Sequence, residues 1–197
     1  MWNEQIIMML LEGIKDTLYM TLTSTLIGYV IGLPMGILLT VTDKDGIHPN
    51  AAVYKVLDVI ANLIRSVPFL ILLIVLIPFT RFLIGRSYGP TATIVPLVIA
   101  AAPYIARMVE SSLKEVDAGV IEAARSMGAS NFTIVTKVML VEARTSLIVG
   151  ATISLGTILG YSAMAGTVGG GGLGDIAIRY GYTLSLIHIS EPTRLQL

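Results

Sequence analysis

Long apolar runs separated by short polar stretches dominate the chain. Residues 17–42 contain no Asp, Glu, Lys or Arg, and a helix of that length, at about 1.5 Å per residue, exceeds the roughly 30 Å hydrocarbon core of a bilayer. The pattern therefore predicts a first membrane span. Three further predicted spans cover residues 59–80, 88–106 and 146–168. The expected fold is an all-α membrane protein with four spans.

The first sixteen residues differ from the run that follows them. Apolar and polar residues alternate there, which suits a short helix lying at the membrane interface or a loosely ordered terminus. Glu4 and Glu12 stand where a signal peptide would carry basic residues. We therefore expect the first span to be retained in the mature protein.

Glycine and proline residues within the predicted spans indicate where helices pack closely and where they bend. Gly28, Gly32 and Gly36 recur every four residues, which places bare backbone on one helix face and favours close packing of a neighbouring helix over contact with a substrate. Three of the four spans contain proline, which is typical of bent or locally unwound helices in transporters and channels.

Arg65 and Pro68 lie within the second predicted span. An arginine in a span is costly unless it reaches the membrane surface or finds a partner. One interpretation puts Arg65 at the surface beside its loop. The other pairs it with carbonyl groups freed by Pro68, close to a gate.

The longest polar stretch lies between the last two spans, at residues 107–144. Its centre, Val120–Gly128, has small residues on a predicted short helix that ends at a glycine able to adopt positive φ. Ser130 is a plausible N-cap for a second helix that carries Phe132 towards the membrane. Glu122 and Arg125, three residues apart, would steady the first helix by a few tenths of a kcal/mol.

Such a protrusion can be approached closely by the surface of another protein. The alternative is an ordinary amphipathic loop that rests on its own bundle.

Composition excludes several classes of function. Hydrophobic residues make up 54% of the 197 residues and charged residues only 13%, against about 25% charged in soluble domains. The 13 basic and 13 acidic residues leave no basic face for nucleic acid.

If the polar stretch is cytoplasmic, the excess of Lys and Arg on the cytoplasmic side has the sign that the positive-inside rule expects, but it is too small to settle the topology alone.

No motif indicates an enzyme. The chain has no cysteine and no G-x-x-x-x-G-K-[ST] phosphate loop, so any ATP must be bound by another polypeptide. Gly169, Gly171 and Gly174 formally match G-x-G-x-x-G, but they follow a span and are expected to form a turn. Ser162 lacks the surroundings of a hydrolase nucleophile, and no charged residue lies mid-span as an ion-coupled transporter would require.

Several motifs together resemble one family. Glu122-Ala123-Ala124, then Gly128, followed after nine residues by Val138 and Leu140, resembles the cytoplasmic loop of ABC-importer permeases. Four further segments resemble the methionine-importer branch: Arg65–Phe69, Ala102–Arg107, Gly160–Gly174 and Tyr180–Tyr182. The resemblance covers roughly residues 10–183.

The resemblance implies a division of the chain. Residues 1–16 would be an interfacial segment, 17–183 an ABC type-1 transmembrane domain, and 107–144 its cytoplasmic coupling loop. Glu122, Ala123, Ala124 and Gly128 would belong to the coupling helix that docks on the ATPase, with Arg65 and Pro68 at a gate or packing site. No catalytic residue, cofactor or metal is implied, and the residues that bind substrate are unknown.

The resemblance also implies partners. These are an ABC ATPase subunit, an extracytoplasmic substrate-binding lipoprotein, membrane lipid and a second permease copy, in a bacterial inner membrane. The transported solute would be an amino acid, methionine above all. The alternatives are a permease for another small solute or, less favoured, an ion-coupled secondary transporter.

Two departures from the family pattern stand out. Val141 replaces the proline that usually follows the loop leucine, which would soften a local bend. Residues 184–197, with Pro192 and two charges, cannot form the fifth span of the family. They resemble a non-native tail on a C-terminally truncated permease, which we expect to assemble poorly.

Overall fold

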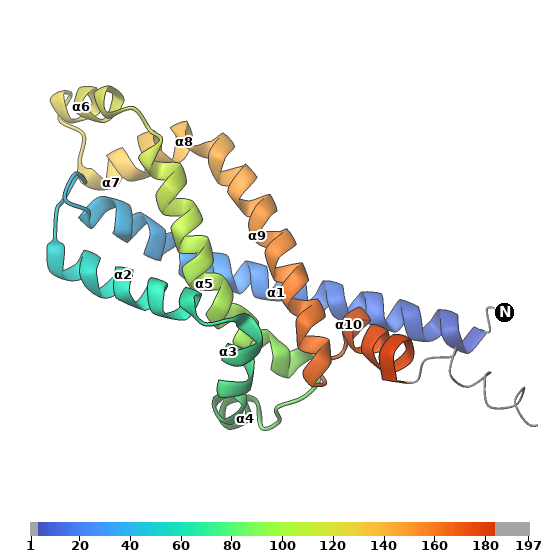
Figure 1. The fold of residues 1–197 in the computed structure, drawn as a ribbon. Coiled ribbons are helices and arrows are strands. Elements are labelled where there is room, and N and C mark those ends of the chain that lie inside the picture. The colour runs from blue at the N-terminus through green and yellow to red at the C-terminus, as the bar shows by residue number, and fades with distance from the viewer. Residues whose placement is uncertain (1–3, 184–197) are drawn as a thin grey trace, which may run out of the picture. The chain divides into compact units, whose positions relative to one another are not determined.

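The structure is a computed structural model that describes residues 4–183 (Figure 1). Within that range the regular elements are helices, and three of them are long and apolar enough to cross a membrane; a bent pair of shorter helices makes a fourth candidate span. The expected all-α fold with four spans is therefore confirmed. The predicted tail, residues 184–197, lies outside the described residues.

The first span is part of a longer helix. α1 (Glu4–Thr42) runs through Pro34, and no break separates residues 4–16 from the apolar run. A turn at residues 43–50 follows, in which the His48 amide donates to the Val41 carbonyl at 3.0 Å.

The second span differs from the prediction. α2 (Ala51–Ser66) begins eight residues before residue 59, because Asn50 caps it by accepting a hydrogen bond from the Val53 amide at 3.2 Å. The helix ends at Ser66, and Val67 is extended (φ −87°, ψ 125°), as expected for a residue before proline. α3 (Phe69–Val75) and α4 (Ile77–Ile84) follow. The predicted bounds of the second span were therefore wrong, while the break at Val67 and Pro68 agrees with the bent helices that proline predicts.

The third span also runs on beyond its predicted end at Ala106. α5 (Pro90–Lys114) remains helical through Pro96 and Pro103. Residues 107–114 of the predicted polar loop are therefore the end of this helix rather than a loop.

The remaining elements are α6 (Ala118–Ser126), α7 (Asn131–Thr133), the π-helix η1 (Ile134–Met139), α8 (Leu140–Glu142), α9 (Arg144–Ala165), the 3₁₀ turn η2 (Gly166–Val168), α10 (Gly172–Ile176) and the π-helix η3 (Ala177–Thr183).

The chain divides into two compact units. Unit 1 contains Met1–Ser24, Phe69–Leu97 and Thr157–Leu197, and unit 2 contains Thr25–Pro68 and Val98–Gly156. The predicted coupling loop lies wholly in unit 2.

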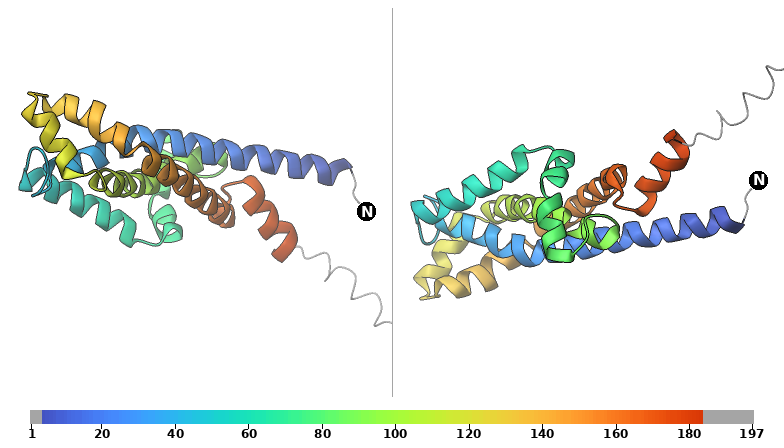
Figure 2. Two further views of the ribbon diagram at one scale, coloured as in Figure 1. Left: turned by 90° about the horizontal axis from the view of Figure 1, so that it is seen from above. Right: turned by 90° about the horizontal axis from the view of Figure 1, so that it is seen from below.

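Unit 2 confirms the prediction of close packing at the spaced glycines. A Cβ added at Gly32 would lie 2.6 Å from the Ala102 carbonyl oxygen, and one at Gly36 would lie 2.5 Å from that of Ala106. Only glycine allows α1 to approach the α5 backbone this closely. Figure 2 shows α2 beside the C-terminal half of α5 in both views.

In unit 1 the glycine run begins as a turn at residues 169–171 and leads directly into α10. Gly169, Gly171 and Gly172 have positive φ, and the Leu173 amide donates to Thr17 Oγ1 at 2.9 Å. Phe69 and Tyr161 stack with ring centroids 4.6 Å apart. The G-x-G-x-x-G match is thus a close-packed turn and helix start against α1.

Candidate functional site

The polar loop of unit 2 is built around α6. Asp117 begins this helix by accepting a hydrogen bond from the Gly119 amide at 2.7 Å, which satisfies one of the unpaired donors of a helix N-terminus. Asp117 was not singled out from the sequence, although aspartate before a short apolar helix is a recognisable start signal.

The end of α6 is the turn that the sequence predicts. Gly128 has φ +81°, its amide donates to the Arg125 carbonyl at 2.9 Å, and the Ala129 amide donates to the Ala124 carbonyl at 3.1 Å. These two bonds are the Schellman arrangement, which requires a left-handed residue after the helix. Gly128 therefore confirms the expected helix stop.

α6 has an inner and an outer face. Ala124 is 5% exposed and packs inward, whereas Glu122, Ala123 and Gly128 are exposed. Met127 is 81% exposed. The helix is thus a protrusion with small residues and one large apolar side chain on its outer face.

The chain returns from α6 through a second, irregular helical segment. Ser130 accepts a hydrogen bond from the Thr133 amide at 3.2 Å, so the predicted N-cap is confirmed. The segment then widens into η1, which buries Ile134 and Met139. Phe132 is 78% exposed and adds to the apolar surface near Gly128. Ala143 separates α8 from α9.

A groove of about 470 Å³ lies beneath α6, between the turn at residues 43–50, the end of α5 and Met139. Arg125 crosses it, and its Nη2 donates to the Ile47 carbonyl at 3.1 Å. The predicted Glu122–Arg125 pair does not form. The Arg125 guanidinium instead contacts a backbone carbonyl of the turn at residues 43–50.

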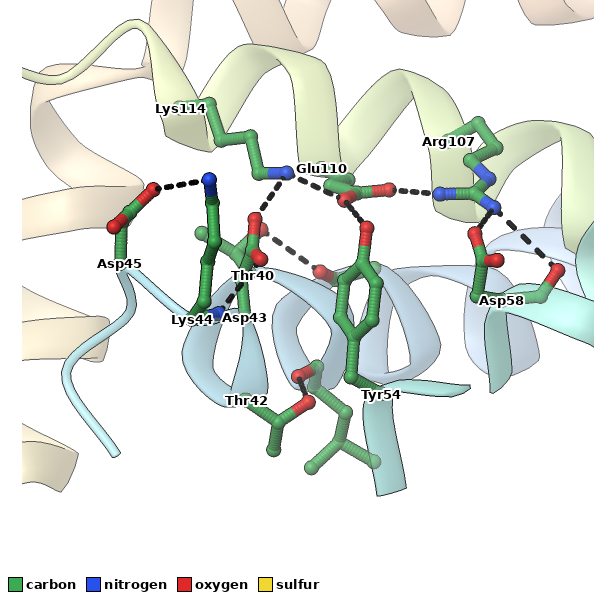
Figure 3. Close-up of polar contacts among 12 residues, drawn as sticks. Thr40, Thr42, Asp43, Lys44, Asp45, Tyr54, Asp58, Arg107, Glu110 and Lys114 are labelled. Carbon is green, nitrogen blue, oxygen red and sulfur yellow. Dashed lines mark hydrogen bonds and ion pairs between the residues drawn. The ribbon is translucent and has the colours of Figure 1, made fainter. Parts of the chain in front are cut away.

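A row of charged side chains ties α5 to its neighbours in unit 2 (Figure 3). Arg107 Nη1 contacts Glu110 Oε2 at 2.7 Å, and Arg107 Nη2 pairs with Asp58 of α2. Lys114 Nζ bridges Glu110 Oε1 at 2.8 Å and Asp43 Oδ2 at 2.6 Å. We call these five residues the charge ladder.

Polar and aromatic groups complete the charge ladder. Tyr54 donates its hydroxyl to Glu110 Oε1 at 3.4 Å, and Asn62 Oδ1 accepts from Arg107 Nη2 at 3.0 Å. In the turn after α1, the hydrogen bond from Lys114 lowers the pKa of Asp43, because it stabilises the carboxylate. The ladder went unnoticed in the sequence, although positions 107, 110 and 114 share one helix face.

The other predicted site residues, Arg65 and Pro68, are both exposed at the end of α2. Arg65 occupies the last helical turn, directly before the extended Val67. Among residues 4–183, no group of three His, Asp or Glu side chains is arranged to hold a metal ion.

The chain is similar over most of its length to known membrane-transport proteins. The family model of the binding-protein-dependent transport system inner membrane component matches residues 9–187. A probable D-methionine transport system permease protein MetI from Vibrio cholerae is 48% identical over 189 residues, covering 96% of this chain and 84% of that protein. The D-methionine transport system permease protein MetI from Escherichia coli strain K12 is 52% identical over 164 residues, covering 83% and 76%.

A solved structure shows the same fold. It is an inward-facing conformation of the MetNI methionine ABC transporter, with a TM-score of 0.90 and 51% identity, covering 92% of this chain and 84% of the matched chain.

Proposed function

This chain belongs to the family of binding-protein-dependent transport system inner membrane components, and we propose that it is the permease subunit of an ATP-driven methionine importer. The curated relatives that support the substrate are named as D-methionine permeases. Three long apolar helices and one broken span fit a multi-pass protein of the inner membrane. Its partners are an ABC ATPase, a second permease copy and a substrate-binding protein.

The observation that carries the proposal is the outer face of α6. Glu122, Ala123 and Gly128 are exposed on a short helix, held at one end by Asp117 and at the other by the Schellman turn. Small residues let a partner surface approach the helix backbone, and Met127 and Phe132 supply exposed apolar area beside it. This helix is the coupling helix that enters a groove of the ATPase, while Ala124 packs on the permease.

ATP hydrolysis belongs to the separate ATPase chain, because this sequence lacks a phosphate loop. Nucleotide-driven movement of that partner shifts the permease between inward-open and outward-open states. The interruption of the second span at Val67 and Pro68 is the place we propose for a gate, beside the exposed Arg65.

Co-purification with the ATPase tests the docking role. The tagged chain is expressed with a candidate ATPase subunit, unaltered or with Glu122→Lys or Gly128→Trp. Capture by the unaltered chain and loss in both variants are expected, because one variant reverses an exposed charge on α6 and the other places a bulky ring in the open space beside the end of the helix.

Two matched controls separate docking from folding. Gly85 also ends a helix at φ +81° with open space around its Cβ position, so Gly85→Trp carries the same backbone strain outside α6. Glu12→Lys reverses an exposed charge on α1. Both controls should capture the ATPase normally. Equal loss in the controls, or retention by the α6 variants, would contradict the proposed coupling helix.

A further inference from the structure

The charge ladder joins segments that are distant in the sequence. Asp58 lies on α2, Asp43 in the turn after α1, and the remaining three members on α5. Three carboxylates alternate with two cations, so each cation lies between two carboxylates. The ladder therefore links three segments of unit 2 through one continuous set of ion pairs.

The middle of the ladder is buried, whereas the side chains at its ends reach solvent: Lys114 is 42% exposed and Asp58 31%. The Glu110 side chain is 6% exposed and the Arg107 side chain 17%. Charges at that depth are costly unless they are paired and hydrogen-bonded. Replacing either residue with an apolar one leaves its former partners with uncompensated charge.

α2 depends on these contacts more than its neighbours do. Ala61 is its one buried residue among the sixteen, and Val56, Val59 and Leu63 are all more than half exposed. α1, by contrast, packs tightly on α5 through its glycines. Polar contacts to Arg107 and Glu110 therefore reinforce an attachment of α2 to α5 in which few apolar side chains of α2 are buried.

The ladder is also continuous with α6. Lys114 is the last residue of α5, three positions before the N-cap Asp117. Asp43 belongs to the turn whose Ile47 carbonyl accepts a hydrogen bond from Arg125 of α6. Two of the three segments that the ladder joins, α5 and the turn after α1, thus also hold α6.

We infer that Arg107 is a positioning residue for coupling: through Asp58 and Glu110 it makes α2 move together with α5 and the coupling helix. The inference rests on the proposed function. A displacement of α6 by the ATPase then reaches α2, which leads directly into the break at Val67 and Pro68, without relying on apolar packing that α2 largely lacks.

The test replaces the ion pair with a covalent link. The chain has no cysteine of its own, so Asp58→Cys with Arg107→Cys introduces a unique pair of thiols. The double variant is reconstituted with the ATPase and binding protein, before and after bridging by a short bis-methanethiosulfonate reagent. Methionine transported per ATP hydrolysed is measured.

The unbridged double variant should retain ATPase capture but transport about tenfold less methionine per ATP, within the 5–150-fold range of typical coupling between sites. Bridging should restore most of the ratio. Arg107→Lys, which keeps the charge but loses the two-pronged contact, should fall between. Asp45→Asn, which alters an 83% exposed carboxylate in the same turn as Asp43, should match the unaltered chain.

The outcomes are distinguishable. A double variant that stays fully coupled, or a bridged one that stays uncoupled, overturns the positioning role. If the double variant does not fold, Asp58→Asn serves instead, and normal coupling in that variant also overturns it. Failure of the unaltered chain to capture an ATPase contradicts the proposed function and leaves no coupling to measure.

Discussion

Replacing glycine with alanine should have opposite effects on the stability of the fold at Gly36 and at Gly150. Both are buried helical glycines in unit 2. A Cβ at Gly36 would lie 2.5 Å from the Ala106 carbonyl oxygen and 2.7 Å from Val109 Cβ, whereas one at Gly150 would lie 3.6 Å from the nearest atoms of Met108. The first position has no room for a methyl group, and the second has ordinary van der Waals space.

The magnitudes follow from that geometry. Alanine is favoured over glycine inside a helix by about 1 kcal/mol, and burying one methyl group adds up to about 0.8 kcal/mol. Gly150→Ala should therefore stabilise the fold by about 1–2 kcal/mol. Overpacking costs about 1–3 kcal/mol, and Gly36→Ala lies at the upper end because a backbone oxygen cannot rotate away. Its net effect should be a loss of about 1–2 kcal/mol.

Thermal unfolding of the purified chains in one detergent measures the difference. At about 2–4 °C per kcal/mol for a chain of this size, the Tm of Gly36→Ala should lie at least about 4 °C below that of Gly150→Ala. Gly28→Ala, whose Cβ would meet the Ile105 side chain at 3.0 Å, should fall between. Equal Tm values, or a more stable Gly36→Ala, would refute the close approach of α1 to α5.

Two further predictions concern the coupling loop and its neighbouring turn. Asp117→Ala removes the cap of α6, which costs about 1 kcal/mol, and should weaken ATPase capture severalfold in a titration; unchanged affinity would show that the cap does not matter for docking. Lys114 lowers the pKa of Asp43, so this carboxylate adds stability that is present above its unfolded pKa of about 4 and is lost as the pH falls through its lower folded pKa. Asp43→Asn should therefore have a lower Tm than the unaltered chain at pH 7, with the gap closing below about pH 4; a gap that is constant from pH 3 to 7 would contradict this.

Locally determined features were predictable from the sequence. Gly128 and Ser130 were assigned as helix stop and N-cap because each role depends on hydrogen bonds within a few residues. The glycine period of α1 likewise indicated a close-packing face, since spacing alone puts Gly28, Gly32 and Gly36 on one side. The chemistry of single residues and their spacing was enough for these predictions.

The predicted end of the third span at Ala106 was wrong, because α5 continues to Lys114. Arg107 and Glu110 looked like the start of a polar loop because isolated charges do not continue a membrane span. In the structure they remain in the helix, because Asp58 and Tyr54 of α2 satisfy them. The charge of a residue is visible in sequence, but the partner that makes its burial tolerable is not.

The sequence by itself determined the four apolar runs, the family motifs, the helix stop at Gly128 and the N-cap at Ser130. Only the tertiary structure decided which face of α6 is exposed and that Arg125 contacts Ile47 instead of Glu122. It also decided that the charge ladder connects α2 to α5. The first group follows from interactions between residues a few positions apart. The second joins residues such as Asp58 and Arg107, 49 positions apart, whose meeting depends on how the helices pack.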